Sequence, residues 1–186
     1  VFSPIQTAEA AVLRPRQAPP PTLSAASPES DGFDFPVGPP DGRGYYNAQV
    51  FGANHHLGDD WNGTGGGNSD KGDPIHSTAN GIVVSAYDGG PGWGNVVRIL
   101  HRAAGADPGL VESLYAHLET MHVRQAQVVR RGQKIGTMGD AGGRYYAHLH
   151  FEIRIRPGLP LGGGYARDTR GYTDPTAFIR SQRPRA

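Results

Sequence analysis

The sequence predicts a mainly β domain built around an antiparallel sheet, with few short helices and a proline-rich N-terminal segment. Two observations support this fold class. Short stretches with an apolar residue at every second position recur along the chain, and this period is typical of strands that bury one face. The 186 residues also include 28 glycines and 16 prolines, so turns must be frequent and long helices rare.

The N-terminal segment differs in composition from the rest of the chain. Nine of the 16 prolines fall within residues 1–40, and "APPPT" and "SAASPES" occupy residues 18–22 and 24–30. Such a segment has few side chains that could build a core. We therefore expect residues 1–32 to form a Pro/Ser/Ala-rich tail or linker, and residues 33–186 to form one folded domain. "FDFPVGPP" at residues 33–40 is expected to be the first strand of that domain.

Strand candidates then follow at short intervals. The best are "GIVVSAY", "GNVVRIL", "VESLYAHL" and "HLHFEIRI", at residues 81–87, 94–100, 111–118 and 148–155. The segment "VVRRGQKIGTMG" at 128–139 predicts a short strand, a turn and a second strand. The best helix candidate is "DPTAFIRSQ" at 174–182, where Asp174 can cap the helix and Pro175 suits its first turn.

Composition excludes several classes of function. The 18 basic and 17 acidic residues nearly balance, which gives no general case for a nucleic-acid or membrane partner. The chain has no cysteine, so any metal must be held by histidines and carboxylates. No apolar run reaches the length of a membrane span. The glycine-rich loop at 63–73 lacks the Gly-Lys-Ser/Thr ending of a phosphate-binding loop.

The stretch "HLHFEIRI" places polar and apolar residues in strict alternation. Its apolar face is expected to meet the core, and its polar face to meet water or a site. Two imidazoles on one strand face lie close enough to act on the same ion or the same substrate atom. The polar set comprises His148, His150, Glu152 and Arg154, and the apolar set comprises Leu149, Phe151, Ile153 and Ile155.

A second cluster of metal-ligand residue types is "NHHLGDDWNG" at 54–63. The spacing His-x-x-x-Asp occurs there twice, as His55 with Asp59 and as His56 with Asp60, and Gly58 favours a tight loop between them. One histidine and one aspartate from this cluster, together with one histidine of "HLH", would give the three protein ligands that catalytic zinc prefers. The spacing alone leaves both His/Asp pairs open.

A further histidine, His117, lies in the strand candidate "LYAHL". If the apolar residues that alternate with them point inward, Tyr115 and His117 are expected to point out of the core. The opposite set, which would then point inward, is Leu114, Ala116 and Leu118.

Taken together, these segments resemble the zinc endopeptidases of the lysostaphin and LytM type, which cut peptide cross-links in bacterial cell walls. The likeness spans roughly residues 50–180. It is carried by "HLGDD", "GDPIHSTANGIVVSAY", "GWGNVVRILH", "YAHL", "GQKIGTMGDAG", "HLHFE" and "DPTAFI", in the order of the family.

The resemblance assigns roles to particular residues. The family places a glycine two positions after the ligand histidine, so Gly58 selects His56 and Asp60 over His55 and Asp59. His150 is the third expected ligand of one Zn²⁺, and His117 and His148 are the expected catalytic pair. A groove formed by loops is expected to bind substrate, with walls supplied by Trp61, Trp93, Tyr145 and Tyr146.

The implied activity is hydrolysis of peptide cross-links or stem peptides of peptidoglycan. The protein is then expected to be a monomer that is secreted, periplasmic or attached to the cell envelope. The first residues, "VFSPIQTAEAAV", fit either the remainder left by signal-peptide removal or the edge of a fragment.

Two other functions stay open. One is a non-catalytic activator of a cell-wall hydrolase, although degenerate members of the group usually lose ligands and none is missing here. The other is a zinc peptidase that cuts glycine-rich proteins. The chain departs from the family pattern at Tyr145 and Tyr146, where small or polar residues are common, and in a longer loop at 58–74.

Overall fold

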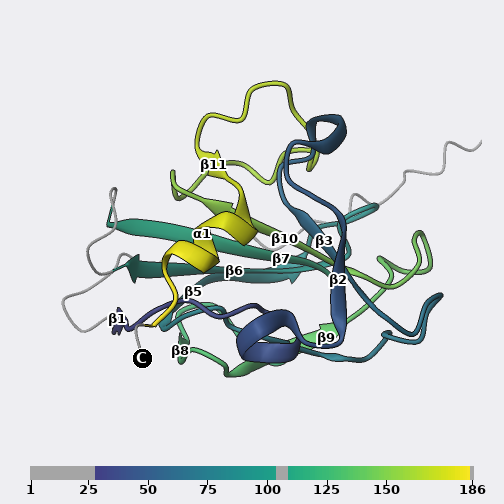
Figure 1. Ribbon diagram of the computed structural model, residues 1–186, viewed down its shortest axis with the longest axis horizontal. Helices are drawn as coiled ribbons and strands as arrows, with labels where there is room; N and C mark the ends of the chain where they lie inside the picture. Colours follow the sequence, from purple (N-terminus) through teal and green to yellow (C-terminus); the bar gives the residue numbers. More distant parts are fainter. Residues whose placement is uncertain (1–27, 104–108, 185–186) are drawn as a thin grey trace, which may run out of the picture.

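The computed structural model describes residues 28–103 and 109–184. The predicted tail at residues 1–32 therefore lies outside the described residues as far as position 27. The described chain folds into a strongly curved sheet, with short helical turns at its margins and one short α-helix against one of its faces (Figure 1). The early elements are β1 (Glu29–Ser30), η1 (Gly38–Gly42), β2 (Tyr45–Gln49), η2 (Ala53–His55), β3 (Asp59–Gly63) and β4 (Pro74–His76). The later elements are β5 (Gly81–Asp88), β6 (Asn95–Ala103), β7 (Leu110–Met121), β8 (Val128–Val129), β9 (Lys134–Met138), β10 (Leu149–Arg154), β11 (Tyr172–Thr173) and α1 (Pro175–Ser181).

The sheet is antiparallel, as the sequence predicts. Its strands follow the order β2-β3-β10-β7-β6-β5-β8, while β9 pairs with both β4 and β7. The short β1 pairs with β6 in parallel. Strand β10, which carries most of "HLHFEIRI", lies between β3 and β7, so its backbone hydrogen bonds are satisfied on both sides. A central strand is a rigid place for functional side chains.

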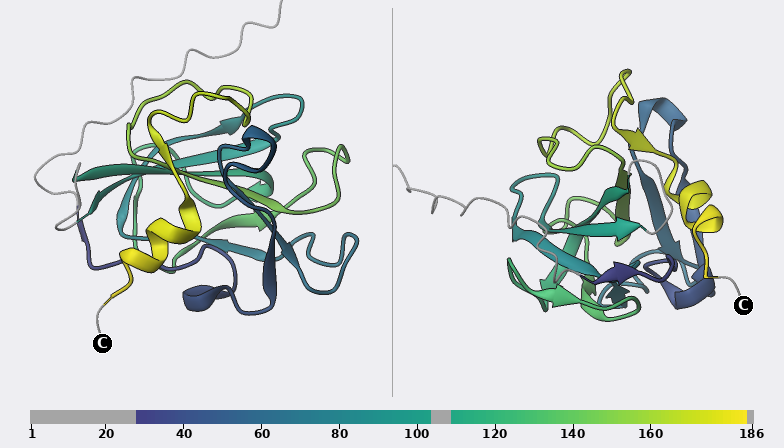
Figure 2. Two further views of the ribbon diagram at one scale, coloured as in Figure 1. Left: turned by 45° about the horizontal axis from the view of Figure 1, so that its top comes forward. Right: turned by 90° about the vertical axis from the view of Figure 1, so that its left-hand side faces the viewer.

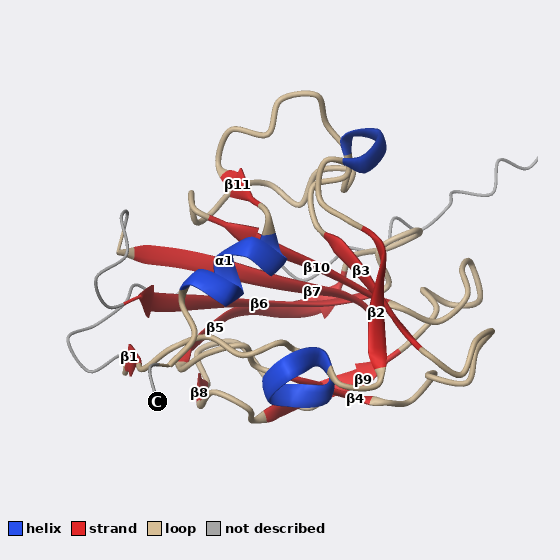
Figure 3. Cartoon of the chain, viewed as in Figure 1, coloured by secondary structure: helices blue, strands red, loops and turns tan. Residues whose placement is uncertain are grey.

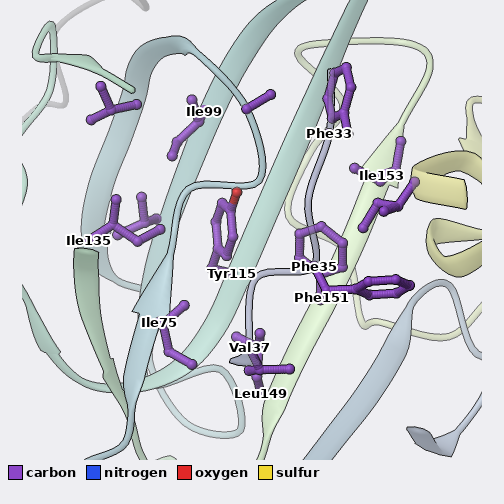
Figure 4. Close-up of a cluster of buried hydrophobic side chains, with 14 of the residues drawn as sticks. Phe33, Phe35, Val37, Ile75, Ile99, Tyr115, Ile135, Leu149, Phe151 and Ile153 are labelled. Atoms are coloured by element: carbon purple, nitrogen blue, oxygen red, sulfur yellow. The ribbon is translucent and has the colours of Figure 1, made fainter. Parts of the chain in front are cut away.

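The apolar face of β10 points into the main core, as alternation predicts. Leu149, Phe151 and Ile153 are fully buried there, and the Phe151 ring packs against Tyr115 with centroids 5.2 Å apart (Figure 4). The expectation for Ile155 is wrong. It lies beyond the end of β10, where the backbone leaves the sheet, and it is 37% exposed.

The segment 33–40 is not a strand, which corrects the expectation for "FDFPVGPP". Phe33, Phe35 and Val37 do alternate into the core (Figure 4). Their backbone instead bonds to scattered partners, with the Phe33 N–H donating to the Gln182 carbonyl and the Asp34 N–H to the Thr78 carbonyl. An apolar residue at every second position therefore indicates which side chains join the core, but not whether a neighbouring strand is present.

Strand β7 contains a bulge at His117 that changes the expected orientation of its side chains. His117 has φ of 63°, and the register of β7 against β6 shifts at this point. The extra residue lets Ala116 and His117 share one face of the sheet. Tyr115 and Leu118 consequently both face the main core, so the expectation that Tyr115 points outward and Leu118 lies opposite it is wrong.

Helix α1 begins and ends as the sequence predicts. The Asp174 carboxylate accepts the Ala177 N–H at 2.9 Å, and Pro175 occupies the first turn. Figures 2 and 3 show the helix lying against the sheet as the longest helical element. Its Phe178 packs edge-on against Phe33, with ring centroids 5.0 Å apart. None of the helices described is long and apolar enough to cross a membrane.

A series of hydrogen-bonded polar side chains lies in the core around His101, which is fully buried. Its Nδ1–H donates to the Asn80 carbonyl at 2.9 Å, and its Nε2 lies 2.7 Å from Ser113 Oγ. Ser113 Oγ in turn lies 3.0 Å from the Tyr115 hydroxyl. Burial lowers the pKa of His101 to about 4, so this side chain is neutral in the folded protein near pH 7.

The His101 environment predicts a loss of stability in mild acid. Its pKa is lower in the folded protein than the value of 6.5 for an ordinary histidine, so the stabilisation is complete above pH 6.5 and declines as the pH falls toward 4. The decline is expected to be roughly 3 kcal/mol of unfolding free energy. Urea unfolding of wild type and His101→Gln across this range should show a flatter pH dependence in the variant. Equal slopes would contradict the prediction.

Candidate metal centre and groove

Three side chains of the described residues converge on one point beside the sheet. They are His56, Asp60 and His150. His56 Nε2 lies 3.0 Å from His150 Nδ1, and Asp60 Oδ1 lies 3.0 Å from His150 Nδ1 and 3.3 Å from His56 Nε2. The three atoms therefore form a nearly equilateral triangle.

The sheet register accounts for two corners of this triangle. In the antiparallel pair β3–β10, Asp60 stands directly opposite His150, so both side chains project from the same face of the sheet. His56 follows the short turn η2 and is fixed by an isolated bridge to Tyr165. The chain between His56 and Asp60 also passes close to β10, because a Cβ on Gly58 would lie 2.4 Å from the Phe151 carbonyl oxygen.

The geometry and the donor chemistry both fit a zinc ion. In a tetrahedral site with N and O ligands at 2.0–2.1 Å from zinc, ligand atoms are roughly 3.3 Å apart. The His150 Nε2–H donates to Glu152 Oε1 at 3.0 Å, so in the neutral ring that would bind a metal, Nδ1 presents a lone pair to the triangle. Asp60 in its ionised form offers only lone pairs. A cation at the centre would satisfy donor atoms that otherwise face one another.

The local electrostatics also favour a cation. Burial opposes ionisation of Asp60, but hydrogen bonds from His150 and His56 outweigh it and hold the pKa of the carboxyl well below its usual range. Burial likewise lowers the pKa of His150, but its hydrogen bonds to Asp60 and Glu152 outweigh that and raise the pKa to about 9. The two carboxylates thus favour positive charge at this imidazole, which a proton supplies in the metal-free protein and a bound cation could supply in its place.

The bulge in β7 brings His117 onto the same face. Its ring centroid lies 4.7 Å from that of His148 and 5.7 Å from that of His150. The ring Nδ1–H donates to the Trp93 carbonyl at 3.1 Å, which leaves Nε2 for a substrate. Burial, with the charges of His148 and His150 adding to it, lowers the pKa of His117 to about 3. A positive φ in a non-glycine residue is a strained conformation of the kind that often occurs at functional sites.

His148 is held by contacts that sequence reasoning missed. Its Nδ1–H donates to the Tyr146 carbonyl at 2.8 Å, and its Nε2 lies 3.9 Å from Asp60 Oδ1. The preceding residue, Ala147, is clamped on both sides. Its N–H donates to Asn68 Oδ1 at 2.8 Å, and its carbonyl accepts from Asn62 Nδ2 at 3.0 Å. Because neither asparagine lies in a recognisable pattern, only the structure identifies this clamp.

Glu152 and Arg154 continue the polar face of β10 beneath the site. Arg154 is fully buried, and its Nε donates to Glu152 Oε2 at 2.7 Å. Its Nη1 donates to the Leu159 carbonyl at 3.1 Å and its Nη2 to the Leu161 carbonyl at 3.3 Å. One arginine thus supports the carboxylate that orients His150 and also fixes the loop 155–171.

The converging residues line the floor of a groove whose walls are formed by loops. A pocket of about 530 Å³ is lined by Asp60, His117, His148 and His150, together with the side chains of Trp93 and Tyr145. Loop 155–171 adds Gly163, Gly164 and Tyr165. The Trp93 indole N–H donates to the Gly162 carbonyl at 3.1 Å, which ties this wall to the strand β6 side of the groove.

Other residues singled out by the sequence lie elsewhere. Asp59 is buried and accepts from the Phe51 N–H and from the N–H and hydroxyl of Thr176, so it fastens the start of α1 to β3. His55 is exposed. Trp61 was expected in the groove but is 7% exposed and packs edge-on against Phe35 in the core.

Comparison with known proteins identifies the family. The model of Peptidase family M23 matches residues 61–162, which is more than half of the chain. The protein belongs to this family. The matched segment includes His117, His148 and His150 and begins just after Asp60.

The sequence relatives include proteins with different described roles. Lipoprotein NlpD of Yersinia enterocolitica is 45% identical over 86 residues, which cover 46% of this chain and 81% of that protein. Murein hydrolase activator NlpD of Salmonella dublin is 46% identical over 86 residues, covering 46% of this chain and 21% of that protein. Peptidoglycan DD-endopeptidase ShyB of Vibrio cholerae is 37% identical over 87 residues, covering 46% of this chain and 18% of that protein. The chain thus spans about a fifth of the last two proteins.

Solved structures share the fold. The antimicrobial peptidase lysostaphin from Staphylococcus simulans superposes with a TM-score of 0.56 and 24% identity, covering 74% of this chain and 50% of that one. A zinc containing peptidase from Vibrio cholerae gives a TM-score of 0.50 and 27% identity, covering 66% of this chain and 36% of that one. The mainly β fold predicted from the sequence is therefore confirmed.

The two neighbouring aspartates are expected to respond oppositely to substitution. Asp59→Ala removes three hydrogen bonds to a buried carboxylate, which should cost about 3 kcal/mol of unfolding free energy while leaving metal binding intact. Asp60→Ala should abolish stoichiometric metal binding with a smaller change in the stability of the metal-free protein. Urea unfolding and elemental analysis check both variants. Loss of metal from Asp59→Ala with retention by Asp60→Ala would reverse the assignment.

Proposed function

We propose that this chain is a zinc-dependent endopeptidase that hydrolyses peptide cross-links or stem peptides of bacterial peptidoglycan in the cell envelope. The observation that carries the proposal is the triangle of His56 Nε2, Asp60 Oδ1 and His150 Nδ1, which has edges of 3.0–3.3 Å and opens into a groove. The family and the peptidoglycan endopeptidase among the relatives support the same substrate class.

Binding of zinc by the three proposed ligands does not by itself account for proton transfer during hydrolysis. When bound, zinc supplies a Lewis acid that polarises the scissile carbonyl and lowers the pKa of a water. His117 and His148 are proposed to handle the proton and the developing negative charge. Each fixes its ring through Nδ1 on a backbone carbonyl, so each can present Nε2 to the reacting groups. In a neutral ring of this kind Nε2 is an acceptor, so either imidazole can take the proton of the attacking water. Once protonated, that ring can donate from Nε2 to the oxyanion or pass the proton to the leaving amine.

Glu152 is proposed to act through His150 rather than on substrate. Its hydrogen bond to Nε2 selects the tautomer in which Nδ1 is unprotonated. Hydrogen-bond partners of this kind orient metal-bound imidazoles and raise their basicity. Arg154 keeps that carboxylate charged and correctly placed, because its guanidinium is buried against it.

A second candidate function is a non-catalytic activator of a cell-wall hydrolase. It is favoured by the relative from Salmonella dublin, which is described as a murein hydrolase activator. The two functions differ in what they require of the groove. An activator has no need for two further imidazoles placed beside a three-ligand cluster, and this chain has both.

Digestion of purified peptidoglycan distinguishes these functions. The wild-type protein loaded with one equivalent of zinc should release soluble fragments, and a chelator should stop the release. The masses of the fragments would name the bond that is cut. If zinc-loaded wild type releases nothing, yet increases the activity of a separate wall hydrolase, the activator function replaces the endopeptidase.

Removing either catalytic imidazole is expected to separate zinc binding from turnover. His117→Ala and His148→Ala should each keep one zinc per chain and lose at least about 100-fold in rate, because general acid–base groups contribute on this scale. His122→Ala is the matched control, since His122 is exposed and the hydrogen bond of its side chain among the described residues is to Thr120. A near-normal rate in either test variant would remove that histidine from the mechanism.

A further inference from the structure

The groove continues past the metal centre into a second pocket. This pocket has a volume of about 550 Å³. Arg144, Tyr145 and His148 line both pockets. A peptide held across His148 would therefore occupy both, with Arg144 beside the bond to be cut. The second pocket is completed by Asn62, Asn68, Asp140, Gly143 and Tyr146.

Arg144 stands on a well-anchored turn. The Asp140 carboxylate accepts the Gly143 N–H at 2.8 Å, and the Asp140 carbonyl accepts the backbone N–H groups of Arg144 and Tyr145 at 3.0 and 3.1 Å. Lys71 Nζ donates to the same carboxylate at 2.7 Å. The backbone that carries Arg144 is thus fixed, while its side chain is exposed at the junction of the two pockets.

The charges around Arg144 leave its guanidinium available. Within the described residues it has no ion pair, and it is the only arginine or lysine that lines either pocket. Both carboxylates in the linings have other partners, since Asp140 is paired with Lys71 and Asp60 belongs to the metal cluster. The fixed charge that the groove presents to a ligand is therefore positive.

Neutral donors lie in the same pocket. Asn68 uses its Oδ1 to accept from Ala147, which leaves its side-chain NH₂ group as a donor. The Tyr146 hydroxyl is a further donor, on a ring that is 73% exposed. An arginine accompanied by amide and hydroxyl donors suits a carboxylate, because the planar guanidinium can bind both carboxylate oxygens.

We propose that the second pocket is a carboxylate-binding subsite, and that Arg144 makes the protein select peptides with a free carboxylate next to the scissile bond. This inference rests on the proposed endopeptidase function and narrows it. Peptides of peptidoglycan carry free carboxylates beside their amide bonds, whereas a polyglycine segment carries none within its length. The subsite thus favours an acidic cross-linked peptide over a glycine-rich protein.

The test uses two synthetic cross-linked peptides that differ only at the carboxylate next to the cross-link, which is free in one and amidated in the other. Binding to the zinc-loaded full chain is followed by the fluorescence of Trp93 and Trp61, and cleavage by mass spectrometry. Wild type should bind the free acid about tenfold more tightly than the amide. Arg144→Gln should lose this preference by weakening the acid alone, and Arg144→Lys should retain part of it. Arg124→Gln, at an exposed arginine outside both pockets, is the control.

The binding and cleavage results separate this inference from the proposed function. Preferential binding of the acid without cleavage of either peptide would retain the subsite and overturn the endopeptidase. Cleavage of both peptides with equal affinity in wild type and Arg144→Gln would retain the endopeptidase and overturn the subsite. Equal loss of affinity for both peptides in Arg144→Gln would also overturn it, since that result indicates a general disturbance of the groove.

Discussion

The antiparallel register of β3 against β10 is the constraint on which the site depends. It sets Asp60 opposite His150, and it places both on the face of the sheet that loop 155–171 covers. Because side chains alternate along a strand, a slip of one residue would turn His150 into the core and bring Leu149 or Phe151 into the groove. The apolar residues of β10 prevent this, since all three are fully buried in the main core. Hydrophobic burial on one face therefore positions the proposed metal ligands on the other.

Buried charge supports this arrangement from below. Glu152 and Arg154 are both inaccessible to solvent, and the network extends through Glu112 to Arg98, whose Nη2 donates to Glu112 Oε1 at 2.7 Å. Removing charges from water is costly, and buried pairs often add little net stability. This network is better explained by the orientation that it gives to His150 and to one wall of the groove. Arg154 bonds to Glu152 and also to carbonyls of loop 155–171, so the proposed ligand His150 and one wall of the groove share a single anchor.

Much of the fold could be predicted because period-2 patterns are local. Strands β5, β6, β7 and β10 follow from alternation. The two short strands β8 and β9 and the cap of α1 follow from turn and capping chemistry. Alternation could not show the bulge at His117, since an extra residue leaves no mark in composition. It also could not distinguish a strand from an extended segment at 33–37, because both can place every second side chain in the core.

The site residues show the same limit. The histidine and aspartate spacing, with the family resemblance, selected the residues that converge, and the structure brings His56, Asp60 and His150 together. Trp61 was expected in the groove because it adjoins Asp60, yet adjacent residues of a strand point to opposite faces, and Asp60 takes the site face. The clamp on Ala147 depends on hydrogen bonds to Asn68 and Asn62, which lie 79 and 85 residues earlier in the chain. No local pattern encodes contacts of this kind.

The most direct test of the account is the coordination of zinc in the wild-type protein, measured by X-ray absorption after reconstitution with one equivalent of zinc. The account predicts one tightly held zinc bound by two imidazole nitrogens, one carboxylate oxygen and one further oxygen, at about 2.0–2.1 Å. It also predicts that Asp60→Ala loses this set of ligands. Failure to hold zinc, or a shell unchanged by Asp60→Ala, would contradict it.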